Sequence, residues 1–89
     1  MQPFSSFLKS VEEKGALDTK TKELISVSLS IATRCKWCIA FHVKNALDAG
    51  AASDEVMEAC FVAVLMAGGP ALMYTQLAVK AIEEFKRSD

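Results

Sequence analysis

A stretch without any charged side chain, from Ala59 to Val79, most constrains how this chain can fold. Its length is about that needed to span a bilayer as a single helix. However, Gly68-Gly69-Pro70 falls in its middle, and proline inside a helix removes a hydrogen bond and clashes with the preceding turn. Thr75 and Gln76 add polar groups to its second half. We therefore expect two shorter buried helices and no membrane span.

The rest of the chain also favours helices. No segment alternates polar and apolar residues for long enough to predict a strand, whereas apolar residues recur at helical spacing. Turn and cap residues divide the pattern into about five helices joined by short loops. The expected helices are 4–14, 19–33, 36–49, 54–67 and 70–86. The sequence thus predicts a compact all-α domain that covers residues 1–89.

Local signals predict how some of these helices begin, end and pack. The Ser53 hydroxyl should cap the fourth helix, and Gly50 should end the third. The first helix carries the apolar stripe of a short amphipathic helix, made of Phe4, Phe7, Leu8 and Val11. The last helix should turn seven side chains inward, namely Leu72, Met73, Leu77, Ala78, Ala81, Ile82 and Phe85.

The chain is short and rich in apolar side chains. At 89 residues and 52% hydrophobic content, it has more apolar surface than a domain of this size readily covers. We therefore expect a homo-oligomer, and a well-packed monomeric bundle is the alternative. Ten basic and eleven acidic residues give a net charge of −1, without a basic run. A nucleic-acid-binding surface is therefore not expected.

The first residues contain neither a basic leader nor a continuous apolar segment. We therefore expect no signal peptide and a cytoplasmic location. In that reducing compartment, a Cys-x-x-Cys pair indicates metal binding or catalysis rather than a structural disulfide framework.

The chemistry of the chain is concentrated between Cys35 and His42. On a helix, Cys35, Cys38 and the only histidine, His42, fall at i, i+3 and i+7 on one face. Because Cys38 and His42 are i, i+4 neighbours, the imidazole can take the thiol proton and leave a reactive thiolate. The start of a helix favours the same thiolate. Two thiols at this spacing can also close into a disulfide and reopen, as dithiol exchange or peroxide reduction requires.

Glu23 is the candidate partner of this histidine. If the second and third helices form a hairpin, Glu23 and His42 lie at heights that differ by only a few ångströms, at ~1.5 Å rise per residue. A carboxylate beside the imidazole would orient it and raise its basicity. The alternative is that Glu23 is an ordinary acid in the first turns of its helix.

Two other hypotheses use the same residues. A structural zinc site could combine Cys35, Cys38 and His42 with Cys60, although Cys60 lies in an apolar helix and is most simply a small core side chain. A redox-sensing or partner-binding module without enzymatic activity could use the dithiol to control assembly. Trp37 could cover the disulfide, contact a substrate, or pack in a core or an interface.

The spacing of these residues resembles a known family. Glu23, eleven intervening residues, then Cys35-x-x-Cys38-x-x-x-His42, with the Gly50 stop and the Ser53-Asp54-Glu55 restart, resembles the alkylhydroperoxidase D-like branch of the carboxymuconolactone decarboxylase superfamily. The resemblance covers about residues 19–86. It implies an all-helical subunit that assembles into trimers or hexamers, and an antioxidant oxidoreductase activity based on thiols.

The resemblance also implies roles for these residues. Cys38 would attack a hydroperoxide and pass through a sulfenic acid, and Cys35 would resolve it to a disulfide. His42 and Glu23 would form the proton relay, through water. No tightly bound cofactor or metal is implied: a lipoyl group or a thiol protein would supply electrons to a site that reduces hydroperoxides or partner disulfides, and a peroxiredoxin could be a partner. Some members carry a second histidine where this chain has Trp37.

Overall fold

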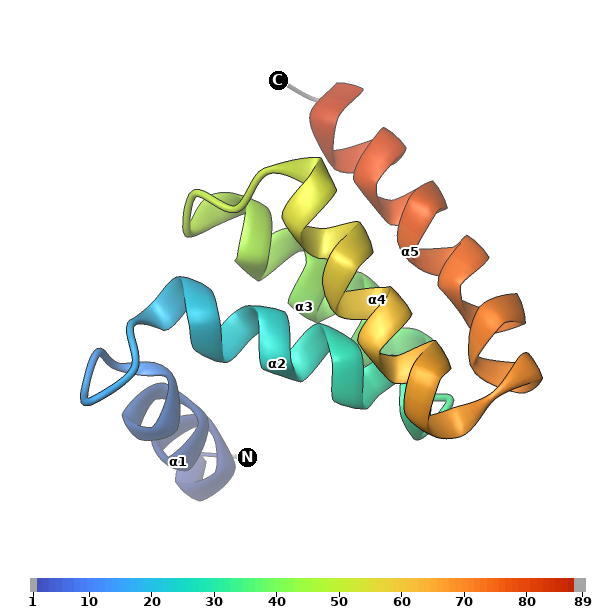
Figure 1. Ribbon diagram of the computed structural model, residues 1–89. Coiled ribbons are helices and arrows are strands. Elements are labelled where there is room, and N and C mark those ends of the chain that lie inside the picture. Colours follow the sequence, from blue (N-terminus) through green and yellow to red (C-terminus); the bar gives the residue numbers. More distant parts are fainter. Residues whose placement is uncertain (1, 88–89) are drawn as a thin grey trace.

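The computed structural model describes residues 2–87, and the side chains of residues 3–86. Five α-helices joined by short loops make up this part of the chain, and it contains no strand (Figure 1). They are α1 (Gln2–Glu12), α2 (Thr19–Ala32), α3 (Lys36–Asp48), α4 (Ser53–Ala67) and α5 (Gly69–Arg87). The all-α prediction is confirmed, and every predicted boundary lies within two residues of the observed one.

The core lies between α2, α3, α4 and α5. Helix α2 packs on both α3 and α4, and α5 packs on α3 and α4. The largest side chains buried between them are Val27, Ile31, Ile39, Val43, Val56 and Cys60. Helix α1 lies to one side, and its backbone approaches only that of α2 (Figure 1). The four-helix core therefore holds α2 and α3, which carry the candidate site residues, against each other.

The uncharged stretch forms two helices, as expected. Helix α4 ends at Ala67, Gly68 has a φ of 80°, and α5 begins at Gly69 with Pro70 in its first turn. Proline is tolerated there because its missing N–H would have no partner within the helix. None of the helices in residues 2–87 combines the length and the apolar character that crossing a membrane requires.

The predicted Ser53 cap is wrong. Helix α4 begins one residue earlier than expected, so Ala52 occupies the cap position. The Glu55 carboxylate reaches back and accepts the Ala52 N–H at 2.9 Å, which satisfies one of the donors left open at a helix start. The Ser53 hydroxyl instead accepts a hydrogen bond from Lys86 Nζ of α5 at 2.9 Å. A contact between distant parts of the chain therefore replaces the local cap.

The predicted inward face of α5 is partly wrong. Ala78, Ala81 and Ile82 are buried, and Leu77 and Phe85 are half-buried against the core, as expected. Leu72 and Met73, however, are 48% and 62% exposed. The first half of α5 buries the small side chains of Ala71 and Thr75 instead, because small residues allow helices to approach closely.

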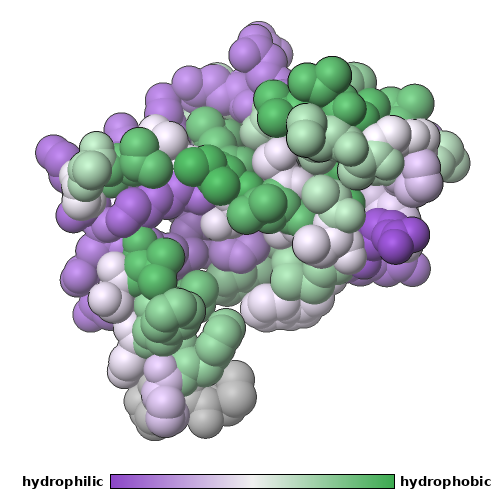
Figure 2. All heavy atoms as spheres, turned by 60° about the horizontal axis from the view of Figure 1, so that its bottom comes forward, coloured by the Kyte–Doolittle hydropathy of each residue, from purple (hydrophilic) through white to green (hydrophobic). Residues whose placement is uncertain are grey.

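The predicted helix α1 forms, but its apolar stripe does not pack in the core. Phe4, Phe7 and Val11 are exposed, and only Leu8 is half-buried. Further large apolar side chains are exposed on α2 and α4, namely Ile25, Leu29, Phe61, Val62, Leu65 and Met66. Figure 2 shows apolar surface spread over one face of the molecule. This surface is what the composition predicted, and the homo-oligomer that would cover it stays a prediction.

Candidate active site

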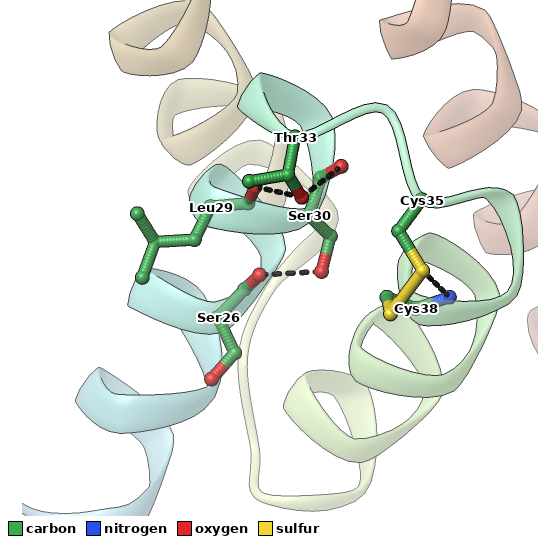
Figure 3. The surroundings of a disulfide bond; sticks show 6 residues. All are labelled: Ser26, Leu29, Ser30, Thr33, Cys35 and Cys38. Carbon is green, nitrogen blue, oxygen red and sulfur yellow. Dashed lines mark hydrogen bonds between the residues drawn. A yellow bond between two sulfur atoms is a disulfide. The ribbon is translucent and has the colours of Figure 1, made fainter.

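The two cysteines lie at the start of α3. Cys35 is the residue before the first helical turn, and the backbone N–H of Cys38 donates to its Sγ at 3.3 Å. The two sulfurs form a disulfide, with the Cα atoms 5.2 Å apart (Figure 3). The first N–H groups of a helix lack partners within it and carry partial positive charge. This position therefore favours the thiolate when the disulfide is reduced.

A tight turn places the disulfide beside α2. Arg34 has a φ of 59°, in the left-handed region, and the N–H of Cys35 donates to the Ser30 carbonyl at 3.1 Å. The Thr33 hydroxyl donates to the Leu29 carbonyl at 2.9 Å. These bonds satisfy the last carbonyls of α2. The chain can therefore reverse within three residues and start α3 against the helix it has just left.

Small hydroxyl side chains of α2 lie near the disulfide. The Ser30 hydroxyl donates to the Ser26 carbonyl at 2.6 Å, and the Ser26 hydroxyl donates to the Lys22 carbonyl at 3.0 Å. Figure 3 shows the two serines on the side of α2 nearer the cysteines and Leu29 on the opposite side. Because the hydroxyls bond within their own helix, they leave room for α3 without leaving buried donors unpaired.

His42 contacts Glu23 across the α2–α3 interface. The imidazole Nδ1 lies 2.8 Å from Glu23 Oε1, and the Glu23 side chain is only 2% exposed. When Nδ1–H donates to the carboxylate, the neutral ring keeps its lone pair on Nε2. Burial lowers the pKa of His42 below its ordinary value of 6.5, an effect that the negative charge of Glu12 partly offsets. The ring is therefore a neutral base at pH 7.

Glu12 is a site residue that the sequence analysis missed. It ends α1, and its Oε2 lies 3.9 Å from His42 Nδ1. Burial, together with a hydrogen bond to Glu23 and the charge of Glu23, raises the pKa of Glu12 to about 7. One signal was present in the sequence: Glu12 and Glu13 come at the end of the first helix, where the helix dipole disfavours acids. Such a position suggests that a tertiary contact holds the acid there.

The proposed cysteine zinc site is not assembled. Cys35 and Cys38 are bonded to each other, and Cys60 is fully buried in α4, where burial raises its pKa to about 11. Among residues 2–87, the one cluster of three or more potential metal-ligating side chains is Glu12, Glu23 and His42, with donor atoms within 4.8 Å of one another. Two of these residues, His42 and Glu23, are already joined by a direct hydrogen bond of 2.8 Å. A carboxylate in this position fixes the tautomer and the orientation of the imidazole.

Comparison with known proteins identifies the family of this chain. Residues 1–81 match the sequence model of the carboxymuconolactone decarboxylase family. The chain belongs to this family. The resemblance to its alkylhydroperoxidase D-like branch, drawn from Glu23, Cys35, Cys38 and His42, falls within it.

Solved structures of this carboxymuconolactone decarboxylase family share the fold. The crystal structure of apo-lpg0406, a family member from Legionella pneumophila, is 45% identical with a TM-score of 0.91, over 96% of this chain and 76% of that one. TM1620 from Thermotoga maritima is 31% identical with a TM-score of 0.89, over 97% and 78% of the two chains. A second structure of TM1620 is described with a suggested involvement in the antioxidative response.

Relatives are also found by sequence alone. The "Uncharacterized protein 4 in cox locus" of Paracoccus denitrificans is 41% identical over 81 residues, which are 91% of this chain and 73% of the relative. A protein of Cupriavidus necator, H16_B0147, is 33% identical over 79 residues, 89% of this chain and 70% of the relative.

An aromatic stack extends from this family member's histidine to the surface. Trp37 is 68% exposed and stacks on Phe41, with ring centroids 4.8 Å apart and an interplanar angle of 14°. Phe41 in turn contacts His42 edge-on, at 5.0 Å and 77°. Trp37 therefore does not pack in the core. It lies at the outer end of the site, where a substrate, a partner or another subunit can contact it.

Proposed function

We propose that this carboxymuconolactone decarboxylase-family protein is a thiol-dependent peroxidase or disulfide oxidoreductase. The observation that carries the proposal is the Cys35–Cys38 disulfide at the start of α3, one helical turn from a histidine that bonds a buried carboxylate. This arrangement supplies a nucleophile, a base and a group that orients the base.

The reaction begins with the reduced dithiol. His42 accepts the proton of Cys38, and the thiolate attacks one oxygen of a hydroperoxide. The O–O bond breaks, the alcohol leaves, and Cys38 becomes a sulfenic acid. Cys35 then attacks the Cys38 sulfur, water leaves, and the disulfide forms. An external dithiol, such as a lipoyl group or a thiol protein, returns two electrons and two protons by thiol–disulfide exchange.

Glu23 and His42 serve these proton transfers. Glu23 fixes the ring of His42 with Nδ1–H toward the carboxylate, so Nε2 remains free to take the thiol proton. The lowered pKa of His42 keeps the ring neutral at pH 7 and able to accept it. The same histidine returns a proton when a leaving group needs one. A partner disulfide can replace the hydroperoxide, because the thiolate attacks a disulfide sulfur in the same way.

The experiment is turnover measured by stopped flow with cumene hydroperoxide, or with a small disulfide, and dihydrolipoamide as the donor. Turnover should vanish in Cys38→Ser and persist in Cys60→Ala, since Cys60 is fully buried away from solvent. Equal rates in wild type and Cys38→Ser would contradict the proposal.

A redox-sensing module is the second candidate function. Leu29 is exposed in the last turn of α2, and its carbonyl bonds the Thr33 hydroxyl in the turn that leads to Cys35. Opening the disulfide could therefore alter the apolar face that includes Leu29. This candidate is favoured if peroxide and disulfide turnover are absent and the oligomer size differs between reduced and oxidised protein.

A further inference from the structure

We propose that Glu12 is a positioning residue of the proton relay, in which its carboxyl group shares a proton with Glu23 and so sets the charge beside His42. The relevance of this relay to Cys38 rests on the proposed function. The arrangement brings three helices into the site, because α1 supplies Glu12, α2 supplies Glu23 and α3 supplies His42.

The contacts place Glu12 inside the relay. Its Oε2 lies 3.9 Å from His42 Nδ1. One carboxylate oxygen of Glu12, one of Glu23 and one ring nitrogen of His42 all lie within 4.8 Å of one another. The Thr19 hydroxyl of α2 donates to the Glu12 carbonyl at 2.8 Å. Lys22 Nζ, also on α2, donates to the carbonyls of Val11 and Glu13 at 2.8 and 2.6 Å. The end of α1 is therefore fixed against the helix that carries Glu23.

The surroundings of the Glu12 carboxyl group favour its protonated form. Its Oε2 is buried and has no donor among the described residues. The Nδ1–H of His42 lies at hydrogen-bond distance from Glu23, at 2.8 Å, and is too far from Glu12, at 3.9 Å. A buried acceptor without a donor is costly, and so are two neighbouring carboxylates that are both ionised. A proton held by Glu12 and donated to Glu23 removes both costs.

The charges around Glu12 make this proton exchangeable near neutral pH. Glu23 of α2 and His42 of α3 face the Glu12 carboxyl group. Lys9 and Glu13, which are close to Glu12 in the chain, line the surface groove beside it. The pKa of about 7 means that Glu12 loses its proton near neutrality. The charge that then appears favours the imidazolium form of His42. Loss of this proton would therefore promote transfer of the Cys38 proton to His42.

Glu12 also connects the relay to solvent. The Glu23 side chain is 2% exposed, whereas that of Glu12 is 21% exposed. The groove on which Glu12 opens is lined by Ser5, Leu8, Lys9, Glu12, Glu13 and Thr19. Protons can therefore reach the buried Glu23 carboxylate through Glu12.

Proton NMR of the reduced, full-length protein tests this assignment directly. His42 is the only histidine in the chain, so its ring signals can be followed between about pH 5 and pH 8 without ambiguity. In the wild type, the ring shift should show the step of His42 itself and a second step near pH 7 from Glu12. In Glu12→Gln, the second step should disappear, and the His42 step should remain, because Glu12 already holds its proton over the range in which His42 titrates.

Two further variants keep the test decisive. Glu13→Gln removes a carboxylate from the next, exposed position and should retain both steps. Glu12→Asp keeps a titrating carboxyl group and should retain the second step at a displaced pH. This variant also provides the test if Glu12→Gln does not fold. A titration of Glu12→Gln that superimposes on the wild type, or an equal change in Glu13→Gln, would overturn the assignment.

This test needs no turnover, so its result is independent of the proposed function. Loss of the second step in Glu12→Gln, without any peroxide or disulfide turnover in the wild type, would support the role of Glu12 and reject the proposed function. Turnover that depends on Cys38, with an unchanged titration in Glu12→Gln, would support the proposed function and reject the role of Glu12.

Discussion

Nδ1 of His42 lies 2.8 Å from Oε1 of Glu23 although the two residues are 19 positions apart in the chain. The contact forms because α2 and α3 pack against each other after the turn at Arg34. It joins a buried acid to the only histidine, one helical turn after Cys38. In the proposed function, this contact provides the dithiol with a base and the base with a partner that fixes its orientation.

Breaking this contact should slow thiolate formation. We expect alkylation of Cys38 in the reduced protein to slow about tenfold in Glu23→Gln and about a hundredfold in His42→Asn, since general-base assistance is typically of this order or larger. Iodoacetamide rates against pH, with the labelled cysteine identified by mass spectrometry, give the measurement. Glu58→Gln, an exposed change on α4, is the control. Unchanged rates in both site variants would argue against the relay.

The Trp37 position should tolerate a second histidine. Because Trp37 is 68% exposed, Trp37→His should cost no more than about 1 kcal/mol, mostly from the lost stacking on Phe41. The added imidazole, next to Cys38, should raise the alkylation rate of that thiol near pH 7. Trp37→Phe is the matched control, because it preserves an aromatic ring without a base. Equal rates in the two variants would mean that a base at this position does not reach the thiol.

Stability should depend on pH through Glu12 and His42, in opposite directions. The pKa of Glu12 rises from 4.5 to about 7 on folding, so its contribution is fully present below pH 4.5 and is lost as the pH rises through about 7. The pKa of His42 falls below 6.5, so its contribution is present above 6.5 and is lost as the pH falls through the folded value.

Urea denaturation of wild type and Glu12→Gln separates the two effects. As the pH rises from 4.5 to about 7, the wild type should lose free energy of unfolding relative to Glu12→Gln. Glu13→Gln should follow the wild type at every pH. A difference that does not vary with pH would show that Glu12 carries no shifted proton.

Gly50 should be hard to replace. Its φ is 98°, and no atom lies within 4 Å of the position that a Cβ would take, so the cost of a side chain there is conformational rather than steric crowding. Gly50→Ala should lower the free energy of unfolding by about 1 kcal/mol. Gly69→Ala, which is equally uncrowded and has no such backbone conformation, is the control and should be neutral or stabilising. Equal effects of the two changes in urea denaturation would contradict this explanation.

The exposed apolar face should be covered by another copy of the chain. We expect the wild type to sediment as an oligomer of its 9.6 kDa subunit. Val62→Glu should shift it toward monomer, because the exposed Val62 lines an apolar groove with Ile25 and Leu29. Lys44→Glu, on an exposed part of α3, should leave the oligomer unchanged. A monomeric wild type in sedimentation velocity would reject the expected assembly.

The sequence by itself determined the helices and the local part of the site. Helical periodicity and caps act over a few residues, so the five boundaries were predictable to within two positions. The same is true of the Cys38–His42 pair, which depends only on helix geometry. The contact between Glu23 and His42 required one further assumption, that α2 and α3 form a hairpin, and the short turn at Arg34 supplies it.

Only the tertiary structure decided which faces pack and what joins the site from a distance. Ala71 and Thr75 are buried in place of Leu72 and Met73, because close approach between helices depends on both partners and not on the hydrophobicity of one. The Ser53 hydroxyl accepts a hydrogen bond from Lys86, 33 residues away, and does not cap its own helix. Glu12 likewise meets His42 through the packing of α1 on α2. Periodicity cannot report such contacts, because they form between surfaces rather than along the chain.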